Sequence, residues 1–145
     1  MNFIDALHTS ASGLTAQRLR MNVVSSNLAN SNTTRTAEGG PYKKKNIVFA
    51  SQPLRTDFQN MVQSHLKGKL TEVKVVGIVD DPRPPILKYD PQHPDADKNG
   101  NVNMPNINLI EEMVNMMSAT RSYEANATAV NATKKMAMKA LEIGK

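Results

Sequence analysis

The stretch that decides the fold runs from residue 3 to residue 30 and reads FIDALHTSASGLTAQRLRMNVVSSNLAN. Apolar side chains recur in it at steps of three, four or seven residues, namely at Ile4, Leu7, Ala11, Leu14, Met21 and Leu28. This spacing places them in one stripe along a helix, as in a coiled-coil seam. Arg18 and Ser25 interrupt the stripe, and Gly13 costs about 1 kcal/mol of helix propensity relative to Ala. The stretch therefore predicts a long helix that needs a partner.

A second helical stretch covers residues 107–143. Its apolar positions follow the same spacing, at Leu109, Met113, Met116, Tyr123, Ala127, Val130, Ala137 and Leu141. Asn108 is a suitable N-cap, and Glu111 and Glu112 would lie in the first turn, where negative charge favours the helix dipole. The sequence thus predicts a C-terminal helix that begins near Ile107 or Asn108 and matches the N-terminal one in kind.

The middle of the chain has a different texture, with β-branched residues and most of the Gly and Pro. Strands are predicted at residues 47–49, 70–79 and 86–89, the last as a returning strand. Residues 58–66 fit a strand or a short helix equally well. Residues 90–108 are polar and rich in Pro and Asn, which predicts an extended connection.

These elements define an α+β fold in which long N- and C-terminal helices pair as a coiled coil around a small β-rich inserted middle domain. We expect three segments: an N-terminal axial helix at 1–33, a β-rich middle with its connection at 34–106, and a C-terminal axial helix at 107–145. A run of Asn, Ser and Thr at 30–34 should end the first helix, because such side chains compete for the backbone.

Composition limits the kinds of protein that this chain can be. Only 39% of the residues are hydrophobic and 4% aromatic, and there is no Trp, so a single large core is not expected. The absence of Cys excludes disulfides and cysteine chemistry. The start of the chain lacks the basic, then apolar, pattern of a signal peptide, and no stretch has the 18–20 apolar residues of a membrane span.

The net charge of +5 comes from scattered basic residues, apart from one run at residues 43–45. No aromatic side chains alternate with these lysines to stack on bases, so we interpret the run as a solvated loop and expect no nucleic-acid partner.

One segment resembles a calcium-binding loop, with Asp95, Asp97, Asn99 and Gly100 at the first, third, fifth and sixth positions. The twelfth position holds Asn106 in place of Glu, and we therefore predict a plain turn. The three histidines lie far apart, and no phosphate loop or paired catalytic carboxylates occur. We predict no catalytic, metal or cofactor-binding residue, and no enzyme.

Both helical stretches carry family signatures. Residues 12–17 and 21–30, followed by Thr33, resemble the N-terminal signature of bacterial flagellar rod and hook axial proteins. Residues 112–117 and 121–126 are similar to the C-terminal signature of the same proteins. The short middle and the segment 93–106 favour a member from the proximal rod of the basal body.

The resemblance implies a structural subunit that assembles helically with other rod subunits and with copies of itself. It also implies export without cleavage through the flagellar type III apparatus, a place in the periplasmic rod, and no direct membrane insertion. Asn27, Asn30 and Asn126 are expected to hydrogen-bond at helix ends or between subunits. The predicted assembly interface comprises Leu7, Leu14, Met21, Asn27, Leu28, Asn30, Thr33, Met113, Met116, Tyr123, Asn126, Ala127 and Val130.

Two other kinds of protein fit parts of the pattern. A cytoplasmic coiled-coil adaptor or export chaperone would explain the two helices but not the different texture of the middle. A small basic nucleic-acid binder would explain only the charge.

Overall fold

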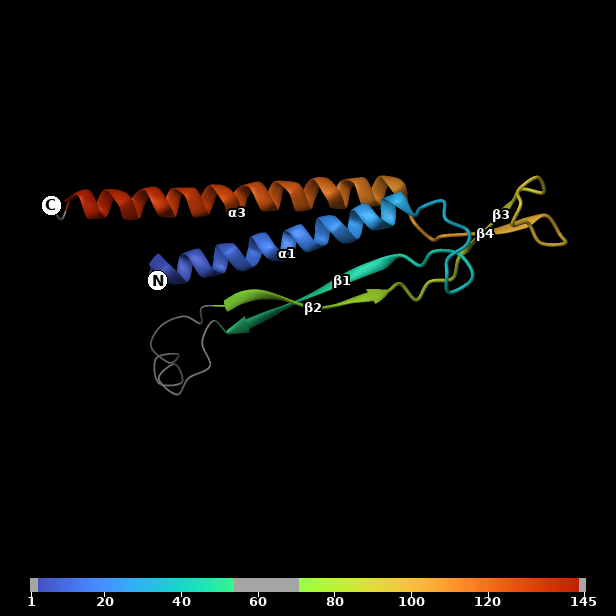
Figure 1. Ribbon diagram of the computed structural model, residues 1–145, viewed down its shortest axis with the longest axis horizontal. Coiled ribbons are helices and arrows are strands. Elements are labelled where there is room, and N and C mark those ends of the chain that lie inside the picture. The colour runs from blue at the N-terminus through green and yellow to red at the C-terminus, as the bar shows by residue number, and fades with distance from the viewer. Residues whose placement is uncertain (1–2, 54–70, 144–145) are drawn as a thin grey trace. The chain divides into compact units, whose positions relative to one another are not determined.

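The structure is a computed structural model that describes residues 3–53 and 71–143 of the 145-residue chain. Helix α1 (Phe3–Ala29) is followed by strands β1 (Lys45–Pro53), β2 (Thr71–Asp80), β3 (Ile86–Tyr89) and β4 (Asn101–Met104), and by helix α3 (Leu109–Ile143). Long terminal helices thus flank small sheets, and the predicted α+β class is confirmed (Figure 1).

The ends of both helices follow the sequence signals. Helix α1 ends at Ala29, and the backbone amide and side-chain amide of Asn30 both donate to the Ser26 carbonyl, at 3.1 and 2.9 Å, which closes the last turn. At the start of α3, the Asn108 carboxamide oxygen accepts the amides of Ile110 at 3.0 Å and Glu111 at 3.3 Å. The predicted N-cap is therefore confirmed.

Strands β1 and β2 form a two-stranded sheet whose arrows run in opposite directions in Figure 1. The strands predicted at 47–49 and 70–79 are confirmed, although β1 is longer than expected and includes Lys45. The open choice between strand and helix at residues 58–66 lies outside the described residues.

The second sheet corrects two predictions. Strand β3 has the predicted bounds, but it does not return to β2; it pairs antiparallel with β4, with Ile86 opposite Met104 and Tyr89 opposite Asn101. The segment 90–108 is therefore not only an extended connection. Strand β4 is four residues long, and only Val102 and Met104 in it are apolar, which is too short a pattern to detect.

The calcium-like segment closes the β3–β4 hairpin as a turn. The Asp97 carboxylate accepts the amides of Asn99 at 2.8 Å and Asn101 at 2.9 Å, so one of its oxygens is occupied within the turn itself. Gly100 has a φ of 75°, and a Cβ there would lie 3.0 Å from the Tyr89 ring. Both the conformation and the close contact require glycine.

The chain divides into two compact units. Unit 1 comprises residues 1–19, 49–76 and 119–145, and unit 2 comprises 20–48 and 77–118. In the described part of the chain the buried apolar side chains are few, and all are aliphatic: Ala16 and Ala119 in unit 1, and Val23, Val24, Val102 and Ile107 in unit 2. Among the described residues no aromatic side chain is buried, which agrees with the prediction that a single large core is lacking.

Candidate assembly surface and its polar clamp

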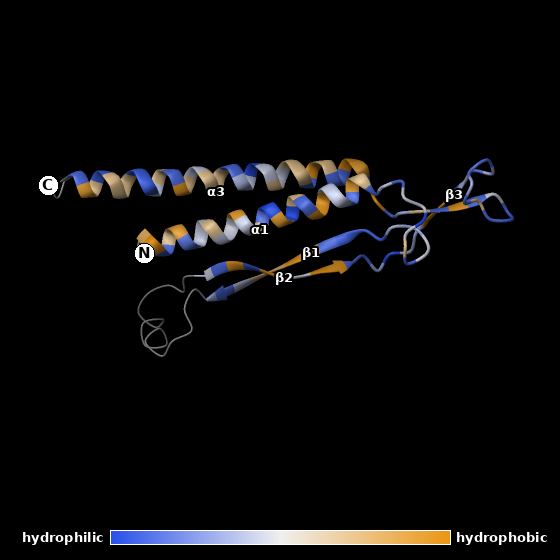
Figure 2. Cartoon of the chain, viewed as in Figure 1, coloured by the Kyte–Doolittle hydropathy of each residue, from blue (hydrophilic) through white to orange (hydrophobic). Residues whose placement is uncertain are grey.

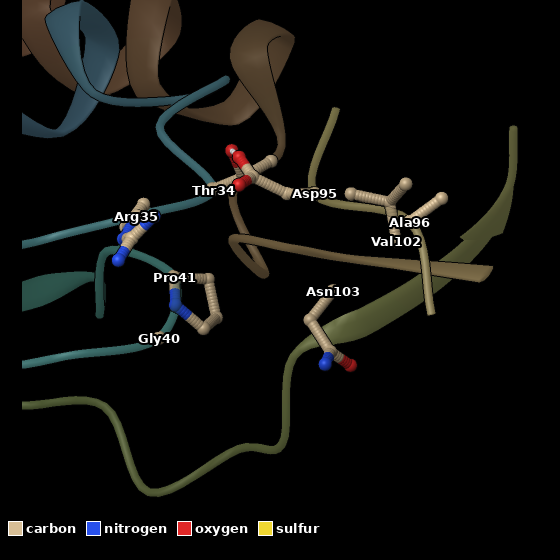
Figure 3. Close-up of a pocket in the computed structure, with 8 residues that line it drawn as sticks. All are labelled: Thr34, Arg35, Gly40, Pro41, Asp95, Ala96, Val102 and Asn103. Carbon is tan, nitrogen blue, oxygen red and sulfur yellow. Dashed lines mark hydrogen bonds between the residues drawn. The ribbon is translucent and has the colours of Figure 1, made fainter. Parts of the chain in front are cut away.

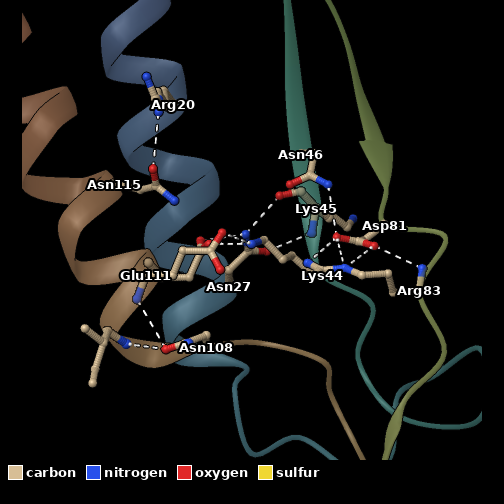
Figure 4. A network of polar contacts seen from close by, with 12 residues as sticks. Arg20, Asn27, Lys44, Lys45, Asn46, Asp81, Arg83, Asn108, Glu111 and Asn115 are labelled. Carbon is tan, nitrogen blue, oxygen red and sulfur yellow. Dashed lines mark hydrogen bonds and ion pairs between the residues drawn. The ribbon is translucent and has the colours of Figure 1, made fainter.

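Unit 2 is held together by a cluster of polar side chains that we call the polar clamp: Asn27, Tyr42, Lys44, Glu111 and Glu112. Figure 4 labels three of them, Asn27, Lys44 and Glu111. Its members come from the last turns of α1, from the residues that lead into β1, and from the first turn of α3. These segments are up to 85 residues apart in sequence. The clamp therefore fixes three elements to one another at a single point.

Asn27 uses the full hydrogen-bonding capacity of its carboxamide. The nitrogen donates to the Lys45 carbonyl at 2.9 Å and to the Glu112 carboxylate at 3.0 Å. The oxygen accepts the Lys45 amide at 2.9 Å and the Tyr42 hydroxyl at 3.1 Å. The residue is only 1% exposed, so each of these bonds replaces water that the buried amide has lost.

Lys44 brings the compensating charge to the buried acid. Its Nζ lies 2.9 Å from a Glu112 oxygen and 3.2 Å from a Glu111 oxygen, and the side chains of Lys44 and Glu112 are 6% and 2% exposed. Burial by itself would lower the pKa of Lys44, but the hydrogen bonds to Glu112 and Glu111 outweigh it and the pKa is raised. The interpretation of residues 43–45 as a solvated loop is thus wrong for Lys44, because the buried acid requires a cation.

A second polar group continues the cluster into the segment after β2. The Arg83 guanidinium pairs with both oxygens of Asp81, at 2.9 and 2.7 Å, and the Asn46 amide donates to the same carboxylate at 3.3 Å. The Arg83 hydrogen bonds hold the pKa of Asp81 far below its usual range. The Asp81 amide in turn donates to the Lys44 carbonyl at 2.8 Å, which ties this group to the clamp.

Within unit 2 the two helices run antiparallel. Asn27 of α1 contacts Glu112 at the start of α3, and Arg20, two turns earlier, donates to Asn115 at 3.3 Å. The contact nearer the start of α1 is thus made to a residue further along α3, as antiparallel helices require.

The clamp leaves one large apolar patch uncovered on the first turns of α3. Leu109, Ile110, Met113, Val114 and Met117 are between 46% and 70% exposed. Their spacing places them side by side on one face of the helix, opposite the side that carries the buried Glu112. Figure 2 shows apolar colour concentrated on these turns. An exposed cluster of this kind marks an interaction surface.

The face of α1 that is buried in the structure is not the face that carries its apolar stripe. The buried positions of α1 are Asp5, Ala16, Val23, Val24 and Asn27, none of which belongs to the stripe. The stripe residues of the predicted interface (Leu7, Leu14, Met21 and Leu28) are only half-buried. Contacts within the chain therefore bury the apolar stripe of α1 only in part.

The remaining predicted interface residues fall into two groups. Met113 is exposed, whereas Met116, Tyr123, Ala127 and Val130 are half-buried on the sheltered side of α3. The polar residues Asn30, Thr33 and Asn126 bond locally: Thr33 donates to Asn30 at 3.2 Å, and Asn126 to the Ser122 carbonyl at 2.9 Å. Asn30 therefore bonds at a helix end as expected, while Asn126 lies inside α3.

Reasoning from the sequence missed Tyr42, Lys44, Glu111 and Glu112 as partners of Asn27. Lys44 sits in a run of three lysines and Glu112 in a pair of glutamates, so nothing in the local pattern separates the buried member from its exposed neighbour. The strand that begins directly after Lys44 was no signal either, because the sequence predicted a strand only at residues 47–49.

A small open cavity of about 310 Å³ lies in unit 2 between the loop at 34–41 and the β3–β4 hairpin (Figure 3). Thr34 donates to the Asp95 carboxylate at 2.7 Å along its edge, and the buried Val102 forms part of its floor. Among the described residues no group of three or more histidine or acidic side chains is arranged to hold a metal ion.

Two family models match the two helical ends. Residues 7–35 match the model described as flagella basal body rod protein, and residues 98–143 match the model described as flagellar basal body rod FlgEFG protein C-terminal. The two matches cover most of α1 and all of α3, which carry the apolar surfaces and the clamp residues Asn27, Glu111 and Glu112. The fold and these matches define the class: the chain is a flagellar basal-body rod protein.

Relatives that are matched over their full length identify the particular family. The chain is 48% identical to the flagellar basal-body rod protein FlgC of Bacillus subtilis, over 100% of both chains. It is 44% identical to FlgC of Borreliella burgdorferi, over 99% of this chain and 98% of that one. Identity to FlgC of Escherichia coli O157:H7 is 38% over 99% of each chain. The chain therefore belongs to the FlgC family of flagellar basal-body rod proteins, which are structural subunits.

Neither helix of the described chain contains a stretch long and apolar enough to cross a membrane.

Proposed function

We propose that this chain is a building block of the proximal rod, where it assembles helically with other rod subunits and with copies of itself. The observation that carries this proposal is the apolar patch at the start of α3, because its five large side chains remain exposed while the clamp beside it is fully bonded. A chain that buries polar side chains and exposes a large apolar surface next to them is suited to a permanent partner that covers this surface.

The proposed organisation keeps three segments. Residues 1–33 and 107–145 act as axial helices that pair as a coiled coil in the rod, and residues 34–106 form the middle segment between them. Two findings support the pairing. The helices run antiparallel in unit 2, and the sheltered positions Met116, Tyr123, Val130 and Ala137 of α3 follow the seven-residue spacing of a seam.

Export in an unfolded state suits the same chain. A subunit that passes uncleaved through the flagellar type III apparatus has to unfold, and this one has no disulfide and few buried apolar side chains among its described residues. We propose that it takes its place in the periplasmic rod, that its helical ends become fully ordered there, and that its role is structural and not catalytic.

The experiment that tests this proposal is incorporation into isolated basal bodies. Leu14→Asp and Tyr123→Asp place a charge on half-buried positions of the two helices and should prevent incorporation. Thr15→Asp, on the exposed side of α1 and outside its apolar stripe, is the matched control and should incorporate normally. The proposal fails if basal bodies lack the wild-type chain, or if both charged variants support normal motility.

A further inference from the structure

Helix α1 contains a notch that fits a side chain of α3. Gly13 lies in the middle of α1, and a Cβ built there would stand 3.0 Å from Nδ2, 3.2 Å from Cγ and 3.2 Å from Oδ1 of Asn126. All three contacts are with one side chain, and they are tight enough that Asn126 would have to shift by a few tenths of an ångström to admit a methyl group at residue 13. The glycine that weakens the helix is therefore the residue that admits Asn126.

The positions around the notch are small and polar. Thr9 and Gln17 lie one turn before and one turn after Gly13 on the same helix face, and the Thr9 Oγ1 and Gln17 Oε1 atoms are buried without a hydrogen-bond partner among the described residues. Asp5 and Ala16, also in unit 1, are 8% and 2% exposed. Burying polar atoms without hydrogen bonds costs free energy, so a specific contact must keep this face of α1 buried.

An apolar face was available and is not used. Leu7 and Leu14 flank the notch residues in sequence, yet they remain half-buried. If α1 rotated about its axis, these leucines would replace Thr9 and Gln17 in the contact with α3. The contact with Asn126 disfavours that rotation. Gly13 is the only glycine on α1 between residues 9 and 17, so only this position leaves space for the Asn126 side chain.

We infer that the contact between Gly13 and Asn126 sets the register and the rotation of α1 against α3, and so keeps the leucine stripe of α1 available to a neighbouring rod subunit. The second half of this inference rests on the proposed function. Gly13 and Asn126 are positioning residues: they act through the direction in which Leu7 and Leu14 face.

The test uses the absence of cysteine from the chain. An antiparallel pair with residue 13 opposite residue 126 brings residue 9 opposite residue 130, so Thr9→Cys with Val130→Cys should form a disulfide in the purified full-length chain. Thr9→Cys with Ala137→Cys reports a slip of one heptad. The measured quantity is the rate of disulfide formation for each pair under dilute conditions.

The substitution Gly13→Ala should change the rate of disulfide formation in opposite directions, depending on whether the notch sets the register. Helix propensity alone would increase pairing, because Ala is the better helix former. The notch predicts that Gly13→Ala lowers the rate for the 9–130 pair by about fivefold and raises that for the 9–137 pair, since about 1 kcal/mol corresponds to that factor. In an Asn126→Ala background, the same substitution should increase the rate for the 9–130 pair. An increase in both backgrounds would overturn the assignment.

The link to assembly has its own readout. Gly13→Ala should reduce incorporation into isolated basal bodies, and Gly13→Ala with Asn126→Ala should restore it. If the disulfide rates change as expected but incorporation does not, the claim about the leucine stripe is overturned while the register stands. A failure of the proposed function itself would be visible separately, as absence of the wild-type chain from the basal bodies.

Discussion

The polar clamp and the apolar patch meet at the first turns of α3, where the clamp residues Glu111 and Glu112 alternate with patch residues, and the two regions differ in what they bury. The clamp contains Glu112 and Asn27, each 1% exposed, and every polar atom of the Asn27 carboxamide is bonded. The patch contains Ile110, which is 70% exposed. At the start of α3, polar groups are thus buried while large apolar side chains are exposed, the reverse of what is usual in an independent globular protein.

The comparison teaches how stability and assembly are separated in this chain. Buried polar contacts are directional, so they hold α1, β1 and α3 in one arrangement without consuming apolar surface. The apolar surface then remains for a neighbouring subunit, where it contributes to association. If the two regions are independent in this way, substitutions in the clamp should change the stability of the free chain, and substitutions in the patch should change only its association.

Lys44→Met should cause the greatest loss of stability. It leaves Glu112 buried without its cation, and breaking a buried ion pair from one side costs about 3–5 kcal/mol of the free energy of unfolding. Urea unfolding followed by the near-ultraviolet signal of the tyrosines measures it. Lys43→Met is the matched control, since Lys43 is exposed and its loss should change stability by less than about 0.5 kcal/mol. Equal effects of the two substitutions would show that the buried pair contributes nothing.

Asn27→Ala should have the next largest effect, about 2–3 kcal/mol, because it leaves the amide and carbonyl of Lys45 without their partner. The same unfolding measurement applies. Asn22→Ala, on the exposed side of α1, serves as the control and should be neutral or slightly stabilising. If Asn27→Ala and Asn22→Ala changed the free energy of unfolding equally, the hydrogen bonds of Asn27 would not be what fixes the three elements.

Ile110→Asp should separate assembly from stability. The position is in the first turn of α3, where a negative charge is favoured by the helix dipole, so the free chain should unfold as the wild type does. Association should weaken by about 30-fold, which corresponds to about 2 kcal/mol for the lost apolar burial. Quantifying the chain in isolated basal bodies measures the effect, with Asn131→Asp on the exposed side of α3 as the control. A loss of stability in the free chain would contradict the independence of the two regions.

The pH dependence is the smallest expected effect. The pKa of Lys44 is raised in the folded chain, so its contribution is complete below its ordinary pKa of 10.5 and is lost as the pH rises through the higher folded value. The pKa of Asp81 is lowered from 3.8, so its contribution is present above that pH and is lost on acidification. Thermal unfolding at pH 9 and pH 11.5 should show a fall in Tm of about 2 °C that Lys44→Met lacks.

The sequence predicted the parts of the fold that depend on local pattern. The bounds of α1 and α3, the Asn108 cap and the strands β2 and β3 follow from periodicity, capping and β-branched residues. Strand β4 was missed because four residues with two apolar side chains carry no period, and the pairing of β3 was wrong as a consequence.

The candidate site was only partly predictable for a different reason. The stripes on both helices were visible, but which face of α1 lies inward depends on the Gly13–Asn126 contact and on Asn27, and these involve residues 113 and 85 positions apart. Gly13 was interpreted as a fault in the helix because its partner could not be known. The burial of Lys44 likewise depends on Glu112, which the sequence places 68 residues away.

Hydrogen exchange of the dilute full-length chain, compared with isolated basal bodies, tests the central claim most directly. The account predicts that amides beside the clamp, at residues 23–27 and 112–116, are protected in both samples. Amides at residues 5–17 and 122–140, whose pairing in the dilute chain is transient, should exchange faster there than the amides beside the clamp and become protected in the rod. Equal protection of those terminal helices in the dilute chain would contradict the account, because it would mean that their surfaces need no neighbour.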